Sequence, residues 1–328
     1  MKTKIEQIAA NSLLTLAAVF LATNAVAGNY NYEVGLSFGS SDTDTATSLA
    51  AAGPDTPLGS LTSSSDSDRL ELSGTWYYSG LSDKNGPKSR AAFLDRASSL
   101  NLAYSYEDLS GSSVSSGLEP PLPPGIPTIP AATGSTDGTS HTLVAGLRHV
   151  WEPSGWYGLA GVTRNDSEID SVFGDFSSSF DTDATAYTLG IGKYLGQATA
   201  LDLSVISSDL DGNDATTWAL SFNHVGSVGS SWHYAADLGV AVSDADEDDG
   251  TYLLGLSLFP TTELEFGFQF SHREGAFESD IDSYEGFASW FVRDHVELHA
   301  RYRTDDFDTN LFTDFDSDQF AIGVNVRF

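Results

Sequence analysis

The sequence has no cysteine and only one methionine. The missing cysteines exclude disulfide bonds and any zinc site of the CxxC type, so stability needs another source. Basic residues are also scarce, because 15 Lys and Arg stand against 46 Asp and Glu for a formal net charge of −31. Phosphates need a basic footprint, so this balance argues against nucleic acid as a partner.

Long hydrophobic runs are missing too, and no stretch reaches the 18 uninterrupted apolar residues of a transmembrane helix. The longest apolar run, Leu13 to Ala22, lies near the N-terminus behind Lys2 and Lys4. It is followed by the A-x-A pattern Ala25-Val26-Ala27, which is typical of a cleavage site. The order of these three features predicts a cleaved secretory signal peptide over 1–27 and a single mature domain over 28–328.

Apolar residues of the mature part recur at every second position rather than with a helical period. In ELEFGFQFS (263–271), for example, Leu264, Phe266, Phe268 and Phe270 alternate with glutamate, glycine and glutamine. Such alternating runs occupy 30–38, 69–78, 98–106, 141–151, 156–164, 184–195, 199–207, 216–225, 231–242, 251–259, 263–271, 284–292, 296–304 and 319–328. Most have the length of a tilted strand that crosses a hydrocarbon layer.

Short gaps between these runs alternate with long ones, which is the pattern of short periplasmic turns and long extracellular loops. We therefore expect an all-β fold, a transmembrane antiparallel up-and-down β-barrel of about 14 strands, with 12–16 compatible with the spacing. An even number of strands puts both termini in the periplasm. One gap does not fit, because 79–97 is long where a short turn is expected.

A soluble all-β protein also alternates, but its inward face must fill a dry core with large side chains. Here the second face is Asn, Ser, Gly, Ala, Glu and Arg, which can line water instead. Trp76, Trp151, Trp156, Trp232 and Trp290 fall near expected periplasmic turns, and only Trp218 lies at the other end. An aromatic girdle at the membrane interface accounts for this placement.

The final stretch QFAIGVNVRF alternates up to Phe328. A last strand ending in Phe resembles the assembly signal of Gram-negative outer-membrane proteins, which their barrel assembly machinery reads. The stretch GPKSRAAFLDRASSLNLAYSY (86–106) resembles a porin family of gammaproteobacteria, in which a Gly-Pro turn precedes an AAFL-type segment. The resemblance implies a porin in the outer membrane of a Gram-negative bacterium, with Phe328 as assembly signal, but no particular solute.

Three functions are then to be weighed. The first is a porin, a water-filled channel for passive diffusion of small hydrophilic solutes and ions. The second is a structural or adhesin-like interaction barrel that its own loops occlude. The third is an enzyme, which we do not expect, because no HExxH, GxSxG or P-loop pattern occurs.

No metal, cofactor or catalytic residue is assigned. Expected partners are outer-membrane lipid, lipopolysaccharide and solutes, and monomer and homo-oligomer both stay open.

The alternation also predicts which charged residues face the lumen, because a charge on the lipid face at mid-depth costs about 2–4 kcal/mol. The predicted pore-lining residues are Arg69, Glu71, Arg148, Arg164, Asp202, Asp237, Glu265, Glu285, Glu297, His299, Arg301 and Arg303. Closure makes the first and last strands neighbours, which should bring Arg69, Arg301 and Arg303 onto one stretch of wall. By the same parity, Leu256→Arg should harm insertion and Ser257→Arg should be tolerated.

The long gaps hold 33 acidic residues and one basic residue. Field lines from them should concentrate cations at the external mouth.

DLDGND (209–214) departs from the EF-hand pattern and is best interpreted as a hairpin tip. The proline-rich stretch 117–135 predicts a stiff exposed loop. The apolar island VFGDF (172–176) lies in the third long gap, and resemblance to general porins, whose third loop folds into the lumen, implies a constriction there.

Overall fold

The computed structural model describes residues 30–50, 57–82, 86–116, 131–210, 213–229, 232–244, 250–275, 279–309 and 313–328. The predicted signal peptide, most of the proline-rich stretch, the middle of DLDGND and residues 245–249 lie outside these residues. The strands are β1 (Tyr30–Ala50), β2 (Pro57–Leu81), β3 (Ser99–Ser115), β4 (Ala132–Trp151), β5 (Trp156–Phe173), β6 (Phe176–Tyr194), β7 (Thr199–Leu210), β8 (Asn213–Val228), β9 (Trp232–Ser243), β10 (Gly250–Thr261), β11 (Leu264–Gly275), β12 (Ser279–Arg293), β13 (Val296–Thr309) and β14 (Thr313–Arg327).

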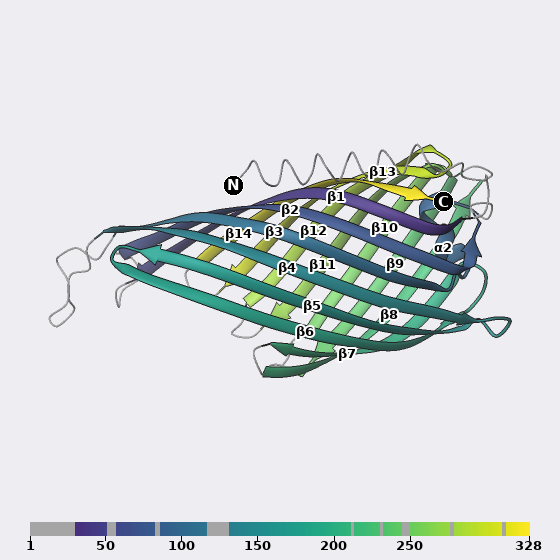
Figure 1. The fold of residues 1–328 in the computed structure, drawn as a ribbon, viewed down its shortest axis with the longest axis horizontal. Coiled ribbons are helices and arrows are strands. Elements are labelled where there is room, and N and C mark those ends of the chain that lie inside the picture. Colours follow the sequence, from purple (N-terminus) through teal and green to yellow (C-terminus); the bar gives the residue numbers. More distant parts are fainter. Residues whose placement is uncertain are drawn as a thin grey trace.

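Each strand pairs antiparallel with the next along the chain, and β1 pairs with β14, so the sheet closes into a barrel (Figure 1). This confirms the predicted fold class and the count of 14 strands. Closure gives every strand a partner on both sides within the membrane-spanning wall, as a membrane requires, whereas the extension of β6 beyond its last pair with β7, Ala184 with Leu210, is paired only with β5. It also answers how a cysteine-free chain is stabilised, because the network of strand pairings is continuous around the barrel.

The outer face of the wall is a band of exposed apolar side chains. Leu256, Phe268 and Tyr302 are each about half exposed, at 51%, 46% and 50%. The five tryptophans that were expected near the periplasmic turns are all exposed on this face. Because only lipid accommodates a closed barrel with such a surface, the chain is an outer-membrane protein, and its short turns mark the periplasmic end.

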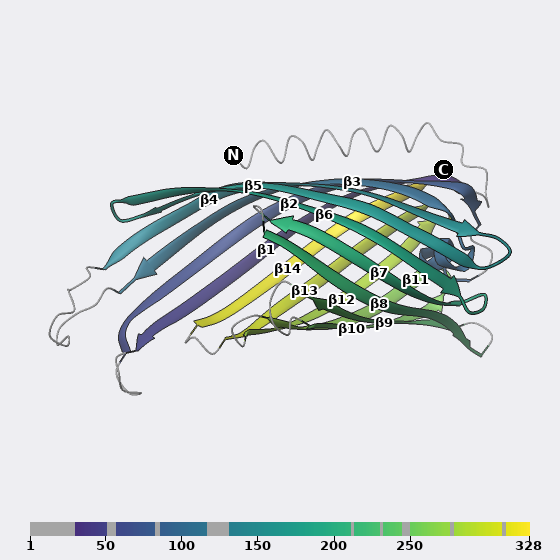
Figure 2. The ribbon, with the colours of Figure 1, turned by 90° about the horizontal axis from the view of Figure 1, so that it is seen from below.

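Strand length divides the barrel into two parts. Strands β1 to β6 have 17–25 residues, whereas β7 to β14 have 12–16. The longer strands reach well past the others at the end opposite α2 (Figures 1 and 2). Much of the sequence that was expected to form the first three long loops is therefore paired strand, because its serines, threonines and aspartates continue the alternation.

The apolar island VFGDF is part of this extension and does not fold into the lumen, so that hypothesis is wrong. Phe173 pairs with Phe176 across a tight turn at Gly174 and Asp175, and Gly174 has a positive φ of 58°. Phe176 is 80% exposed at this hairpin tip. The turn is tight because glycine adopts this left-handed backbone without steric cost.

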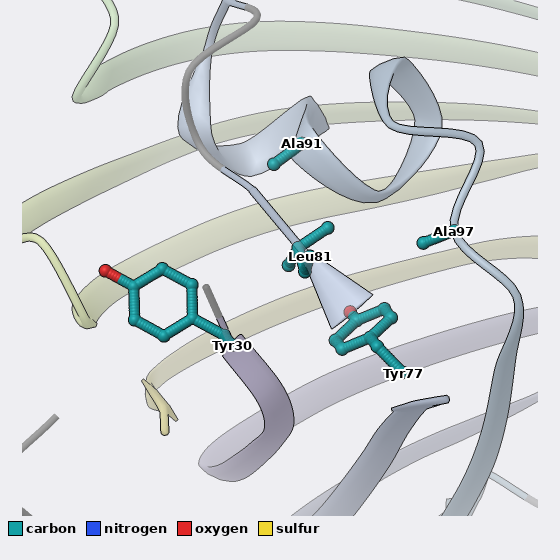
Figure 3. Packing of buried hydrophobic residues seen from close by; sticks show 5 residues of the cluster. All are labelled: Tyr30, Tyr77, Leu81, Ala91 and Ala97. Carbon is teal, nitrogen blue, oxygen red and sulfur yellow. The ribbon is translucent and has the colours of Figure 1, made fainter. Parts of the chain in front are cut away.

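The gap that did not fit the turn pattern has its own structure. Between β2 and β3 lie a short 3-10 helix, η1 (Lys88–Arg90), and a single helical turn, α2 (Ala91–Leu94). We call residues 86–98 the periplasmic segment. Its Ala91 and Ala97 are buried against Tyr30, Tyr77 and Leu81 from the ends of β1 and β2 (Figure 3). A register shift in the pairing of β1 with β2 lies between Tyr30 and Tyr32, and Tyr30 is buried in this cluster.

Candidate functional site: the lumen and its periplasmic closure

The periplasmic segment is joined by charge to one side of the wall. Lys88 lies with its Nζ 2.8 Å from Asp294 Oδ1 and 3.5 Å from Glu263 Oε1. Its backbone N–H donates to the carbonyl of Thr262 at 2.8 Å. Asp294 and Glu263 belong to the turns after β12 and β10, so Lys88 ties two periplasmic turns to the segment.

Arg90 extends the attachment up the inside of the wall. Its Nη2 is 2.9 Å from Asp237 Oδ2 on β9, 3.3 Å from Ser257 Oγ on β10 and 3.6 Å from Glu265 Oε1 on β11. Glu265 is only 5% exposed. A buried carboxylate of this kind is tolerated only when a cation lies beside it, so Arg90 compensates the charge of Glu265.

The C-terminal part of the segment contacts strands from the middle of the chain. The carbonyl of Phe93 accepts a hydrogen bond from Tyr194 Oη at 2.9 Å, and the two rings lie 5.4 Å apart. Arg96 donates to the carbonyl of Gly196 at 2.6 Å, in the turn between β6 and β7. Leu94 packs against the buried cluster of Val225, Ala235 and Phe259 on β8, β9 and β10. The segment therefore contacts both the β6–β7 turn and β9 to β13, and it crosses the periplasmic mouth.

Three contacts of Arg327 add to the periplasmic end of the lumen. Arg327 pairs with Glu33, donates to the carbonyl of Lys88 at 2.8 Å and lies over the ring of Phe291. These contacts join the last strand, the first strand and the periplasmic segment at the place where the barrel closes.

On β4 to β7, predicted residues Arg148 and Asp202 are brought together by two tyrosines. Arg148 donates to Tyr194 Oη at 2.5 Å and stacks over the ring of Tyr157, 4.5 Å from its centre. Tyr157 Oη donates to Asp202 at 2.9 Å. These four side chains therefore form a polar cluster on the lumen side of β4, β5, β6 and β7.

Higher in the barrel the lumen opens into a cavity of about 250 Å³. Arg69, Arg301 and Arg303 line it together, as expected from the pairing of β1 with β14. Glu107 and Glu285 line the same cavity. Arg69 is paired with Glu71 at 3.1 Å, and Arg303 with Asp305 at 2.7 Å.

Strand register assigns each predicted pore-lining residue to a face. Eleven have the lumen parity, namely Arg69, Glu71, Arg148, Asp202, Asp237, Glu265, Glu285, Glu297, His299, Arg301 and Arg303. Glu297 accepts from Asn325 Nδ2 at 3.1 Å, and His299 lies opposite Gly323. Their part in permeation stays a prediction.

Arg164 lies on the outer face, so the prediction that it lines the lumen is wrong. It pairs in register with Leu143, which is 47% exposed on the lipid side, and shares its face with Trp156. Its guanidinium is neutralised there by Asp166 at 3.0 Å and Asp183 at 3.1 Å. The phase was misassigned because small residues alternate with one another in the middle of this strand, leaving the period of two weakly marked.

Sequence reasoning missed the residues that close the mouth, above all Lys88, Arg90, Tyr194 and Arg327. The available signal was the overlong gap at 79–97, where a periplasmic turn should be short. The stretch in this gap is basic and partly apolar, which is the composition of a segment that packs against carboxylates of the barrel wall. Among the residues that the structure describes, no helix is long and apolar enough to cross a membrane, and no group of three His, Cys, Asp or Glu could hold a metal ion.

Comparison with known proteins finds likeness in structure. No family model and no curated protein sequence matches the chain. The crystal structure of outer membrane protein Omp33 of Acinetobacter baumannii aligns over 92% of this chain and 99% of that chain, with 17% identity and a TM-score of 0.52. The transport unit of the autotransporter AIDA-I of Escherichia coli covers 97% of each chain at 9% identity and a TM-score of 0.41. OprB of Pseudomonas putida covers 91% of this chain and 93% of that chain, at 9% identity and a TM-score of 0.35.

Of these three, Omp33 alone exceeds a TM-score of 0.5, and its low identity makes the likeness one of fold. That fold agrees with the closed wall, the apolar outer band and the polar interior described above. The chain therefore has the fold of a 14-stranded outer-membrane β-barrel.

Proposed function

We propose that this barrel is a porin, which forms a water-filled channel for passive diffusion of small hydrophilic solutes and ions. The observation that carries the proposal is the lumen cavity bordered by Arg69, Arg301, Glu107 and Glu285. Charged side chains from opposite ends of the sequence face one another there across unfilled space. A barrel with only a structural role could fill this space with apolar side chains, whereas a channel needs water-facing groups.

The periplasmic segment sets the size of what passes. It crosses the mouth from the turns that hold Thr262 and Asp294 to the turn that holds Gly196. Beside it a hollow of about 830 Å³ is lined by Leu94, Asp95 and Arg96 of the segment, by the end of β2 at residues 80–82 and by Gln197 of the β6–β7 turn. We assign the periplasmic exit to this hollow, which restricts the channel to small solutes unless the segment moves.

Single-channel recording in planar bilayers tests the proposal. The purified, folded barrel should show stable open steps, and the double variant Lys88→Gln/Arg90→Gln should show larger ones, because the segment then loses its ionic attachment. Arg164→Gln, which removes a paired arginine from the outer face, is the matched control and should conduct like the wild type. A folded barrel that never conducts, in either the wild type or the double variant, would overturn the proposal.

The segment across the mouth also favours a second candidate, an occluded barrel that presents its outer loops to partners. Removal of 117–130 distinguishes the two functions. The deletion is confined to these residues because β3 continues to Ser115 and β4 begins at Ala132. A porin should keep or increase its conductance after the deletion, whereas an interaction barrel should lose binding to its partner and show no conductance before or after.

A further inference from the structure

One row of five residues crosses five neighbouring strands on the lumen side. In order along β3, β2, β1, β14 and β13, the row consists of Glu107, Arg69, Gly39, Ala321 and Arg301. Neighbouring strands lie about 4.8 Å apart, so the backbones of Arg69 and Arg301 are about 14 Å apart. Gly39 and Ala321 lie between them and carry at most a methyl group. The two long arginine side chains therefore lie on either side of a gap in which the wall carries only small side chains.

The next row toward the external end adds polar groups around the same gap. It contains Ser67, Ser41, Gln319, Arg303 and Glu285 on β2, β1, β14, β13 and β12. All five line the cavity of about 250 Å³ together with the arginines of the first row. A cavity of this size holds several water molecules and therefore also a small solute of comparable volume.

Two charges in this cavity lack a protein partner. Arg69 is engaged by Glu71, Arg303 by Asp305 and Ser283, and Glu107 accepts from Ser67 Oγ. Arg301 and Glu285 form no hydrogen bond or ion pair with any residue that the structure describes. They are near each other, because Glu285 lies opposite Arg303, and Arg301 is two residues further along the same strand. Such diagonal neighbours have Cα atoms about 7–8 Å apart.

The surroundings disfavour a simple anion as the ligand. The three cavity arginines are accompanied by Glu71, Glu107, Glu285 and Asp305, so four carboxylates outnumber three guanidiniums. The whole chain adds a net charge of −31. An anion could pair with Arg301, but the surrounding charges give it no net attraction. A cation could pair with Glu285, but Arg301 beside it would repel it. A solute with both charges can use both open groups at once.

We propose that the cavity is a binding site for a small zwitterion of the α-amino-acid type. The solute's carboxylate lies against Arg301, whose fork of N–H donors matches the two carboxylate oxygens, with Arg69 facing it across the gap. Its ammonium group lies against Glu285. The hydroxyls of Ser41 and Ser67 and the amide of Gln319 border the remaining space. This names a substrate class for the channel and thus rests on the proposed function for transport, although binding itself does not require conduction.

Three compounds of matched shape test the site. L-Alanine carries both charges, propionate lacks the ammonium group and ethylammonium lacks the carboxylate. Calorimetric titration of the barrel folded in detergent should show that alanine binds at least about tenfold more tightly than either analogue, as expected when a second charged hydrogen bond is added. Propionate binding as tightly as alanine would overturn the proposal in favour of a simple anion site.

Variants assign the two ends. Arg301→Gln and Glu285→Gln should each weaken alanine binding by about ten- to hundredfold, and Glu285→Gln should leave propionate binding no weaker. Arg301→Lys, which keeps the charge but loses the fork, should bind alanine with intermediate affinity. Arg164→Gln on the outer face should bind like the wild type. Full alanine affinity in Glu285→Gln, with the barrel folded as judged by heat-modifiable electrophoretic mobility, would overturn the assignment.

The measurement also separates the two proposals. Saturable alanine binding by a barrel that does not conduct would support the site while removing the channel function. Conductance without any saturable alanine binding would leave the porin proposal intact and overturn the zwitterion site.

Discussion

At the residue scale, the side of the wall on which a side chain lies determines what a new charge costs. Leu256 is exposed to lipid, and the expectation that Leu256→Arg harms insertion stands. Its intended control does not, because Ser257 is 6% exposed and contacts Arg90 at 3.3 Å. Ser257→Arg would press a second guanidinium against the first, which parity alone could not indicate.

A cleaner pair lies on β11, where Phe268 faces lipid and Gln269 faces the lumen opposite Glu285. Phe268→Arg should reduce folding into bilayers by about 2–4 kcal/mol, the cost of arginine at mid-depth. Gln269→Arg should change the folding free energy little, because the lumen face is polar and Glu285 lies opposite. Titration of reversible folding into lipid vesicles measures both. Equal losses for the two variants would contradict the assignment of faces.

At the scale of elements, the periplasmic segment has almost no secondary structure of its own, since η1 and α2 together span Lys88–Leu94. A single helical turn is not stable in isolation. Its place is therefore fixed by contacts with the wall, chiefly the ion pairs of Lys88 and Arg90 and the packing of Phe93 and Leu94. An element held in this way is more easily released than a strand.

Arg90→Gln should loosen this element. Glu265 would lose the cation beside it while staying buried, which costs about 1–3 kcal/mol for an unsatisfied polar group. The chain can relieve that cost by moving the segment, so single-channel conductance should rise as thermal stability falls. Recording and calorimetry of the same preparation check both effects. The conductance and thermal stability of Arg90→Lys should lie between those of the wild type and Arg90→Gln. Unchanged conductance together with unchanged stability in Arg90→Gln would contradict this account.

Acid should release the Lys88 end of the segment. The hydrogen bond and charge of Lys88 lower the pKa of Asp294. The pKa of Glu263 is lowered by the hydroxyl of Thr262 and then by Lys88. Carboxyl groups with depressed pKa values stabilise the folded state above their unfolded pKa, about 3.9 for Asp and 4.3 for Glu, and this contribution is lost as pH falls through the folded values.

We therefore expect conductance to be constant near neutral pH and to rise only below about pH 4. In Lys88→Gln the carboxyl groups lose their cation, so the segment should already be looser at neutral pH and the acid-dependent rise should shrink. Current–voltage recordings at a series of pH values measure this. A wild-type conductance that is the same at about pH 3 as at pH 7 would contradict it.

At the scale of the whole molecule, charge is distributed unevenly between the two faces of the wall. The extensions of β1, β2 and β14 place Asp42, Asp66 and Asp318 in one row, and their parity puts them on the outer face. Inside, the predicted set without Arg164 is joined by Lys88, Arg90 and Arg327 and by Glu33, Glu107 and Asp305, which gives seven basic against nine acidic residues. The lumen therefore stays close to neutral, while the external rim is strongly acidic.

This distribution predicts a mild cation preference that fades as salt rises. The rim carboxylates attract cations to the mouth, but they are exposed, and physiological salt screens them beyond about 8 Å. Reversal potentials in dilute and concentrated KCl measure the preference. Neutralising Asp244, Asp246, Glu247, Asp248 and Asp249 together should reduce it in dilute salt. Strong anion preference would instead assign selectivity to the arginines of the cavity.

The sequence by itself determined the barrel, because a lipid-facing wall imposes a period of two that is local and repeats in every strand. The same period assigned eleven of twelve charged residues to the lumen parity. It was wrong at Arg164, where small residues such as Gly161 hide the phase. It also underestimated β1 to β6, since serine and aspartate pair in strands beyond the membrane without any apolar residue to mark them.

Only the tertiary structure decided how the lumen is closed and where its open charges lie. Lys88 meets Asp294 across 206 residues, and Arg90 meets Asp237 across 147. No local pattern encodes such pairs, because they form only once 14 strands have closed and fixed the width of the mouth. The gap between Arg69 and Arg301 has the same origin: it depends on the join of β1 to β14, and on Gly39 and Ala321 being small where the two strands meet.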